Sequence, residues 1–141
     1  MQREVQKKIF KTHLGWVGIA VSGQGVCRVV LPKKERKAVE RELEQAGESR
    51  QLGQTRRISS VIGRAVKFLQ GYFSGRRITV DLPVDLEDHT EFQQAVWKAA
   101  AKIPFGETRS YGGLAKQIGR PRAARAVGQA MGANPVPVIV P

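Results

Sequence analysis

The stretch IPFGETRSYGGLAKQIGRPRAARAVGQAMGANPVPVIVP, residues 103–141, decides the fold of the C-terminal part of the chain. Ser110 suits the N-cap of a short helix, because apolar residues recur at helical spacing behind it. Gly119 suits the left-handed end of that helix, and Pro121 suits the first turn of the next one. The stretch therefore predicts two short helices joined by a tight turn, which is the pattern of a helix-turn-helix.

The second helix of this pair is predicted from Arg122 to about Met131, and its side chains are mostly those of alanine and glycine. Small side chains let a helix backbone approach another surface closely, and a long cation such as Arg125 can reach further from the same face. On the pattern alone, an ordinary ion pair on the helix surface is the simpler interpretation of Arg125.

The segment after this helix is predicted to be a short apolar strand from Val136 to Val140. Asn134 stands before a proline and is therefore expected to end the helix. Pro137 cannot donate a hydrogen bond to a sheet and favours an edge position for the strand.

The N-terminal part alternates apolar and polar residues in a way that predicts a three-stranded antiparallel sheet. A charged helix over Lys33–Gly47 and a firmer one from Ser59 or Ser60 to Phe73 follow, and then a short strand over Ile78–Leu82. We expect an α+β fold with an N-terminal lobe at 1–82, an acidic linker at 83–89 and a C-terminal lobe at 90–141. The predicted strands are Ile9–His13, Trp16–Val21 and Gly25–Leu31; the apolar face of the second helix is predicted to hold Val61, Ala65, Phe68, Leu69 and Tyr72.

The helix that opens the C-terminal lobe is predicted to begin at Thr90, with Gln93 completing a capping box. The linker before it contains Asp85, Glu87 and Asp88, which we interpret as solvated carboxylates.

The net charge of +12 favours association with polyanions, and nucleic acid is the first candidate. The charge is unevenly distributed, because residues 1–82 hold 17 Lys and Arg against 7 Asp and Glu, whereas residues 83–141 hold 7 against 5. Most of the positive charge therefore lies outside the helix-turn-helix candidate, where a solvated basic face is the simpler interpretation.

Several classes of protein and site are disfavoured by the composition. No apolar run approaches the length of about 20 residues that a membrane helix needs, and no signal peptide is evident, so we expect a cytoplasmic protein without a membrane partner. Cys27 is the single cysteine and lies within a predicted strand, where a small buried hydrophobic residue is expected. His13 and His89 are isolated, and we predict no metal site.

Five motifs in the C-terminal part resemble the methylated-DNA–protein-cysteine methyltransferase family, the alkylguanine-DNA alkyltransferases. The similarity is strong over about the last 50 residues, and the preceding part agrees only in general layout. The resemblance implies a ribonuclease H-like N-terminal lobe and a winged-helix-like C-terminal lobe, of which the wing is missing here. The motifs are FQQAVW (92–97), IPFGET (103–108), SYGGLA (110–115), ARAVG (124–128) and NPVPVIVP (134–141).

The resemblance also implies a function, which is repair of alkylated guanine in duplex DNA. The second helix of the helix-turn-helix would enter the minor groove, Tyr111 would push the target nucleotide out, and Arg125 would take its place in the duplex. A cysteine thiolate would then accept the alkyl group in a single turnover without a cofactor, and the complete protein would act as a monomer. By the same resemblance, the DNA-binding residues are Tyr111, Arg122, Ala124, Arg125, Ala126 and Gly128, and those that brace the active site are Asn134 and Pro141.

The family motif continues after its last proline with Cys-His-Arg, whereas this sequence ends at Pro141. The acceptor, a cysteine or a selenocysteine, would stand at position 142, so we expect no alkyl transfer by these 141 residues. Two alternatives remain. One is a non-catalytic alkyltransferase-like protein that binds DNA lesions, and the other is a plain helix-turn-helix DNA-binding module.

Overall fold

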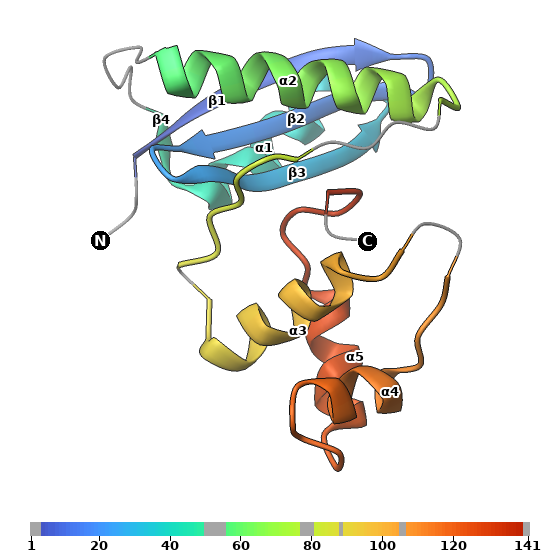
Figure 1. Ribbon diagram of the computed structural model, residues 1–141. Helices are drawn as coiled ribbons and strands as arrows, with labels where there is room; N and C mark the ends of the chain where they lie inside the picture. The colour runs from blue at the N-terminus through green and yellow to red at the C-terminus, as the bar shows by residue number, and fades with distance from the viewer. Residues whose placement is uncertain (1–3, 50–55, 77–80, 88, 105–106, 140–141) are drawn as a thin grey trace. The chain divides into compact units, whose positions relative to one another are not determined.

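The computed structural model describes residues 4–49, 56–76, 81–87, 89–104 and 107–139 (Figure 1). The chain divides into two compact units, which are described separately here. The first unit is Met1–Asp85 with Pro135–Pro137, and the second unit is Leu86–Asn134 with Val138–Pro141. The elements are β1 (Glu4–Thr12), β2 (Gly15–Ser22), β3 (Gly25–Lys33), α1 (Arg36–Leu43), η1 (Glu44–Ala46), β4 (Glu48–Ser49), α2 (Arg56–Phe73), α3 (Glu91–Ala101), α4 (Tyr111–Gln117) and α5 (Ala124–Gly132).

A sheet with the strand order β3-β2-β1-β4 forms the centre of the first unit. Strands β1, β2 and β3 pair antiparallel, which confirms the predicted three-stranded sheet and the α+β class. The two-residue strand β4 adds a parallel pair at the edge of β1, between the two predicted helices, where no strand was predicted. A strand of two residues is too short to show an alternating pattern, so periodicity could not reveal it.

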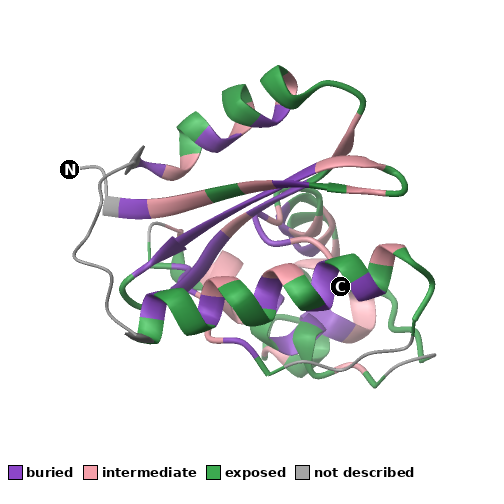
Figure 2. Ribbon diagram, turned by 90° about the horizontal axis from the view of Figure 1, so that it is seen from above, coloured by how far each residue is buried: buried purple, intermediate pink, exposed green. Residues whose placement is uncertain are grey.

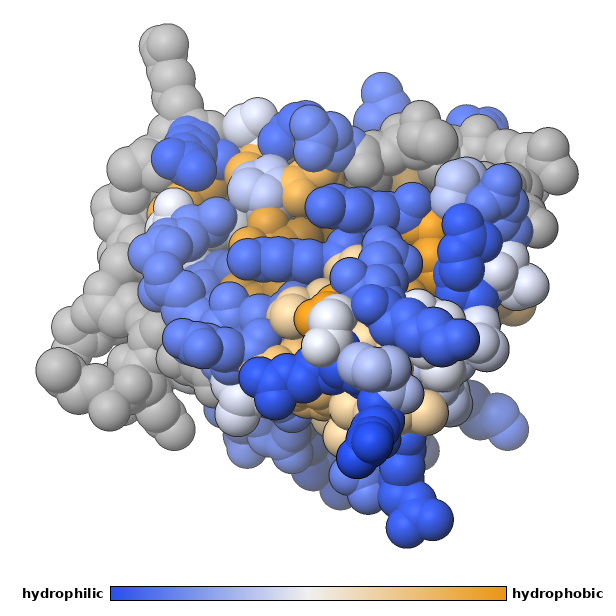
Figure 3. Space-filling model, turned by 60° about the horizontal axis from the view of Figure 1, so that its bottom comes forward, coloured by the Kyte–Doolittle hydropathy of each residue, from blue (hydrophilic) through white to orange (hydrophobic). Residues whose placement is uncertain are grey.

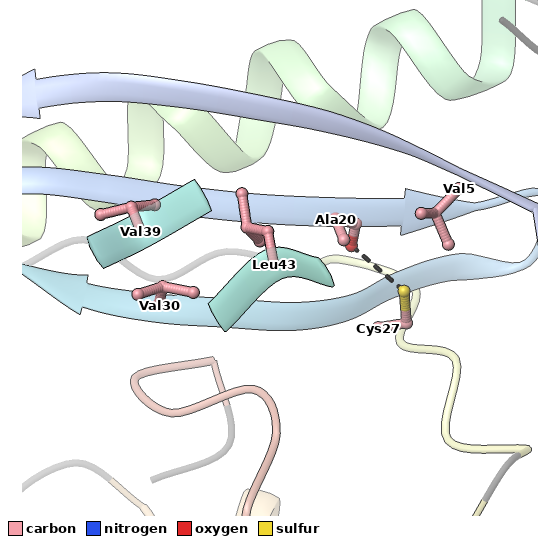
Figure 4. Close-up of a cluster of buried hydrophobic side chains, with 6 residues drawn as sticks. All are labelled: Val5, Ala20, Cys27, Val30, Val39 and Leu43. Carbon is pink, nitrogen blue, oxygen red and sulfur yellow. Dashed lines mark hydrogen bonds between the residues drawn. The ribbon is translucent and has the colours of Figure 1, made fainter. Parts of the chain in front are cut away.

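Helices α1 and α2 cover opposite faces of this sheet (Figures 1 and 4). Helix α1 lies directly on β2, because a Cβ atom at Gly18 would be 2.5 Å from Cγ1 of Val39 and 2.8 Å from Cδ1 of Leu43. Val39 and Leu43 are buried in a cluster that includes Ala20 and Cys27 (Figure 4). A glycine in β2 is thus what lets α1 pack so closely.

Cys27 lies at an irregularity of the β2–β3 pairing. Ala20 pairs with Arg28 and Val21 pairs with Val26, so Cys27 is an extra residue on β3, as in a β-bulge. Its side chain is 4% exposed, and Sγ lies 3.4 Å from the carbonyl oxygen of Ala20. The prediction of a buried, hydrophobic cysteine is confirmed.

Helix α2 begins before the predicted Ser59 and ends at the predicted Phe73. Four of the five residues predicted on its apolar face are buried, but Tyr72 is 47% exposed. Tyr72 lies in the last turn, where its ring contacts that of Phe73 edge-on with centroids 5.2 Å apart.

The segment before the second unit differs from the prediction of a solvated linker. Residues 78–80 of the predicted strand lie outside the described residues, and Leu82 is not in a strand. Asp85 is 4% exposed; its carboxylate accepts a hydrogen bond from the Ser22 hydroxyl, and its N–H donates to the Val26 carbonyl at 2.8 Å. The solvated interpretation of Asp85 is therefore wrong, because a hydroxyl 63 residues earlier offers it a buried partner.

The predicted strand at the end of the chain is also wrong over residues 136–139; Val140 lies outside the described residues. The Pro135 carbonyl accepts a hydrogen bond from the Val29 N–H at 2.8 Å within the first unit. The chain then turns at Val138, which has a φ of 76°. Pro135 and Pro137 have no N–H to donate, so the segment cannot continue a ladder of hydrogen bonds.

Candidate nucleic-acid interface

Helix α3 provides the anchor on which the rest of the second unit packs. The predicted capping box is confirmed, since Thr90 Oγ1 accepts from the Gln93 N–H and the Gln93 side chain accepts from the Thr90 N–H, both at 3.1 Å. Trp97 is fully buried, and its Nε1–H donates to the carbonyl of Ala130 in α5 at 2.8 Å. The indole thus fixes α5 against α3.

Helix α4 begins and ends as its sequence predicts. Ser110 caps it, with Oγ accepting from the Gly113 N–H at 2.9 Å, and Gly119 follows it with a φ of 80°. Helix α5 begins at Ala124 rather than at the predicted Arg122. Pro121 and Arg122 form a turn instead, and the Ala123 N–H donates to the Arg120 carbonyl at 3.0 Å.

The buried sides of α4 and α5 leave an outward face on α5. Leu114, Ala115, Val127 and Ala130 are buried within the pair. Residues 125, 126, 129 and 132 of α5 are exposed, at the spacing of a single helix face. This face holds one long cation, Arg125, among small and polar side chains.

The cations around this face have no acidic partners in the part of the chain that the structure describes. Arg120, Arg122 and Arg125 are exposed, and none of them takes part in an ion pair there. The interpretation of Arg125 as a helix ion pair is therefore not what the structure shows. Arg120, Pro121, Arg122 and Ala123 line a shallow, open hollow at the turn between the helices.

Figure 3, in which the lower end of Figure 1 comes forward, shows a face of the molecule with many hydrophilic side chains and smaller apolar areas between them. Such a surface, with guanidinium groups free to form new contacts, suits an anionic polymer such as the DNA backbone.

Tyr111 and Gly128 meet where α4 crosses α5. Tyr111 is 53% exposed, and a Cβ atom at Gly128 would lie 3.0 Å from both Cδ2 and Cε2 of its ring. The backbone of α5 at Gly128 is thus a close support for one side of the tyrosine ring. Sequence reasoning missed this contact, because it joins residues 17 positions apart through helix packing.

For the remaining predicted site residues, the structure shows the exposure of three and does not describe the fourth. Ala124 is half-buried in the first turn of α5, while Ala126 is exposed. Asn134 is half-buried just after α5, and its N–H donates to the Met131 carbonyl at 3.3 Å. Pro141 lies outside the described residues, so the bracing roles of Asn134 and Pro141 stay predictions.

The two histidines lie in surroundings that suggest no catalytic or metal-binding role. The His89 ring packs edge-on against Trp97 with centroids 4.8 Å apart, and His13 is exposed at a turn. Within the described ranges, no three His, Cys, Asp or Glu residues gather closely enough to hold a metal ion, and no helix is long and apolar enough to cross a membrane.

Comparison with known proteins gives a consistent result. Residues 91–141 match the family model described as 6-O-methylguanine DNA methyltransferase, DNA binding domain. A methylated-DNA–protein-cysteine methyltransferase from Mycobacterium tuberculosis is 57% identical over 77 residues, which are 55% of this chain and 46% of that protein. The chain spans about half the length of the curated relatives that it matches.

Solved structures extend the similarity to both units. The crystal structure of Mycobacterium tuberculosis O6-methylguanine methyltransferase matches with a TM-score of 0.71 and 36% identity, over 97% of this chain and 75% of that one. The structure of Mycobacterium tuberculosis OGT in complex with DNA matches with a TM-score of 0.68 and 37% identity, over the same shares of the two chains.

Proposed function

Because the chain belongs to the methylated-DNA–protein-cysteine methyltransferase family, we propose that it serves DNA repair by direct transfer of an alkyl group from guanine to the protein. The observation that carries this proposal is the outward face of α5, where Arg125 stands exposed and without an ion-pair partner among the described residues. The relative that was solved with DNA supports duplex DNA as the partner.

Helix α5 enters the minor groove in this proposal. Ala126 is exposed next to Arg125, and a methyl group there keeps the helix backbone close to the groove. Arg120 and Arg122 lie at the turn before α5, where they can contact phosphates on either side of the groove.

Extrusion of the target nucleotide is the second step. A base inside the duplex is inaccessible to an acceptor, so the damaged guanine must leave the stack. Tyr111, supported by Gly128, pushes on the backbone of that nucleotide, and Arg125 fills the space that it leaves. The exposure of both side chains is consistent with these roles.

The transfer itself needs a deprotonated sulfur or selenium nucleophile. The S–C bond forms as the bond between the alkyl carbon and the guanine oxygen breaks, and the restored guanine takes up one proton. In this proposal the acceptor is the cysteine or selenocysteine that follows the proline matched by Pro141 in the family motif. Cys27 cannot take this role, because it is buried between α1 and the sheet of the first unit.

A second candidate function is binding to DNA lesions without repair. It needs only the exposed α5 face with Arg125, and no acceptor. Incubation of this polypeptide with duplex DNA that carries radiolabelled O6-methylguanine tests both candidates. We expect no label on the protein from residues 1–141 and single-turnover labelling once Cys-His-Arg follows Pro141. Label that appears on residues 1–141 alone would contradict this assignment of the acceptor.

A further inference from the structure

Helix α2 of the first unit has an unusual charge pattern. It contains four basic residues and no acidic ones over its 18 positions. Arg57, Ser60, Arg64 and Lys67 follow one another at i, i+3, i+7 and i+10, so they lie along one side of the helix. All four are exposed.

These cations have no acidic partners among the residues that the structure describes. Of the residues placed in the structure, none forms an ion pair with Arg57, Arg64 or Lys67. Arg64 Nη1 also donates a hydrogen bond to the backbone carbonyl of Asp81 at 3.2 Å, which leaves its charge unpaired among the described residues.

Helix α1 shows the opposite arrangement. Arg36 pairs with Glu40 at 3.2 Å, and Glu42 pairs with Lys33 just before the helix at 3.2 Å. Exposed cations at Lys34, Lys37 and Arg41 are interspersed with Glu residues along the same segment. The cations of α1 are therefore largely balanced by glutamates of the same segment, whereas those of α2 have no acidic residue on their own helix.

Most of the apolar side of α2 is buried in the fold, although Tyr72 in its last turn is 47% exposed. Ile58, Val61, Ala65, Phe68 and Leu69 are buried, and Figure 2 shows buried and exposed positions alternating along this long helix. A basic helix that inserts into a membrane needs a broad free apolar face, which a single exposed Tyr72 does not provide. The side of α2 that stays accessible to a partner is mainly polar and cationic, so its charge fits an anionic partner.

We propose that Arg57, Arg64 and Lys67 form a second DNA-backbone contact surface, the α2 basic surface. Ten helical residues span about 15 Å, and one DNA strand presents a phosphate about every 3.4 Å along the duplex axis, so about four phosphates lie within reach. Charge complementarity is non-specific, so this surface adds affinity for any duplex. This second surface goes beyond the proposed function, and it depends on that function only for the choice of DNA as the polyanion.

Two triple variants test the proposal. Arg57→Gln/Arg64→Gln/Lys67→Gln removes three charges from α2, and Lys34→Gln/Lys37→Gln/Arg41→Gln removes three charges from α1 and its approach. Glutamine is a good helix former, so exposed substitutions should leave the fold intact, which thermal unfolding checks. Binding to an unmodified duplex is measured by fluorescence anisotropy over a range of salt concentrations.

Each phosphate contact contributes about 0.9 to the slope of log K against log salt, so the α2 variant should reduce that slope by up to about 2.7. The α1 variant should leave the slope close to that of the wild type. Equal reductions in both variants would show an effect of net charge alone and overturn the proposal, as would an unchanged slope in the α2 variant. If the α2 triple variant does not fold, the single variants Arg57→Gln and Lys67→Gln should each lower the slope by about 0.9.

Two further measurements separate this proposal from others. Loss of binding to vesicles of anionic phospholipid, with no change in the DNA slope, would assign the surface to a membrane instead. The ratio of affinities for methylated and unmodified duplex should be unchanged in the α2 variant and lowered by Arg125→Ala. If the proposed lesion recognition is wrong, the ratio of the two affinities will show it. If the α2 basic surface does not bind DNA, the salt dependence of binding will show it.

Discussion

Replacement of Gly128 by alanine is predicted to displace Tyr111 with little net change in the stability of α5. The new Cβ atom would lie 3.0 Å from two carbons of the Tyr111 ring, so the ring must move by a few tenths of an ångström. Tyr111 is 53% exposed and is therefore free to move. The structural cost should be small, but the position from which the tyrosine acts on DNA should change.

The opposing contributions can be estimated. Alanine is favoured over glycine inside a helix by about 0.8–1.0 kcal/mol, which offsets part or all of the steric cost in the free energy of unfolding. A misplacement of 1 Å can reduce a positioned reaction by about 100-fold, so a displacement of a few tenths should reduce base extrusion roughly fivefold.

Gly132→Ala is the matched control for this substitution. It lies in the same helix, and a Cβ atom there would meet no other heavy atom within 4 Å. Base extrusion is measured with a duplex that carries 2-aminopurine at the target position, because the fluorescence of this base rises when it leaves the stack. We expect a reduced fluorescence change at saturating Gly128→Ala and a wild-type change with Gly132→Ala.

A double-mutant cycle identifies the residue through which Gly128 acts. If the effect passes through the Tyr111 ring, Gly128→Ala should add nothing to the loss already caused by Tyr111→Ala. Wild-type base extrusion by Gly128→Ala would refute the predicted displacement of Tyr111. Independent reductions by the two substitutions would show that Gly128 acts through another group.

Three further predictions concern stability and are checked by denaturant unfolding. Trp97→Phe should lower the free energy of unfolding by about 1 kcal/mol or more, because it removes the indole hydrogen bond to the Ala130 carbonyl, which keeps its bond from the Ala133 N–H at 3.1 Å. A change below about 0.5 kcal/mol, on the order of an ordinary surface substitution, would contradict that role. Gly18→Ala should lower the free energy of unfolding by about 1–3 kcal/mol, because the new Cβ atom forces α1 away from β2. Gly63→Ala is the control: a Cβ atom there meets nothing within 4 Å, so it should raise the free energy of unfolding by up to about 1 kcal/mol. Ser22→Ala should lower the free energy of unfolding by about 1–3 kcal/mol, because the Asp85 carboxylate loses a buried hydrogen-bond donor. Ser22→Thr keeps a hydroxyl at this position and should recover part of that loss.

Local chemistry was enough to predict the helix-turn-helix. The N-caps at Thr90 and Ser110 and the left-handed Gly119 act within a few residues of sequence, and all three appear in the structure as predicted. The alternation of β1, β2 and β3 likewise follows from neighbouring residues and predicted the three-stranded sheet.

Features that depend on distant partners could not be predicted in this way. The burial of Asp85 depends on the hydroxyl of Ser22, and the position of Tyr111 depends on the packing of α4 on α5. The apolar composition of residues 136–139 indicated a strand, but the two prolines and the turn at Val138 prevent one. Propensity and periodicity carry no information about which distant group satisfies a polar atom.

The most direct test of the proposed function is the affinity of residues 1–141 for two duplexes that differ only in a single O6-methylguanine. The α5 face with its exposed Arg125 predicts tighter binding to the methylated duplex, and Arg125→Ala should lower that preference more than it lowers affinity for the unmodified duplex. Equal affinity of the wild type for both duplexes would contradict lesion recognition and leave a plain helix-turn-helix DNA-binding module.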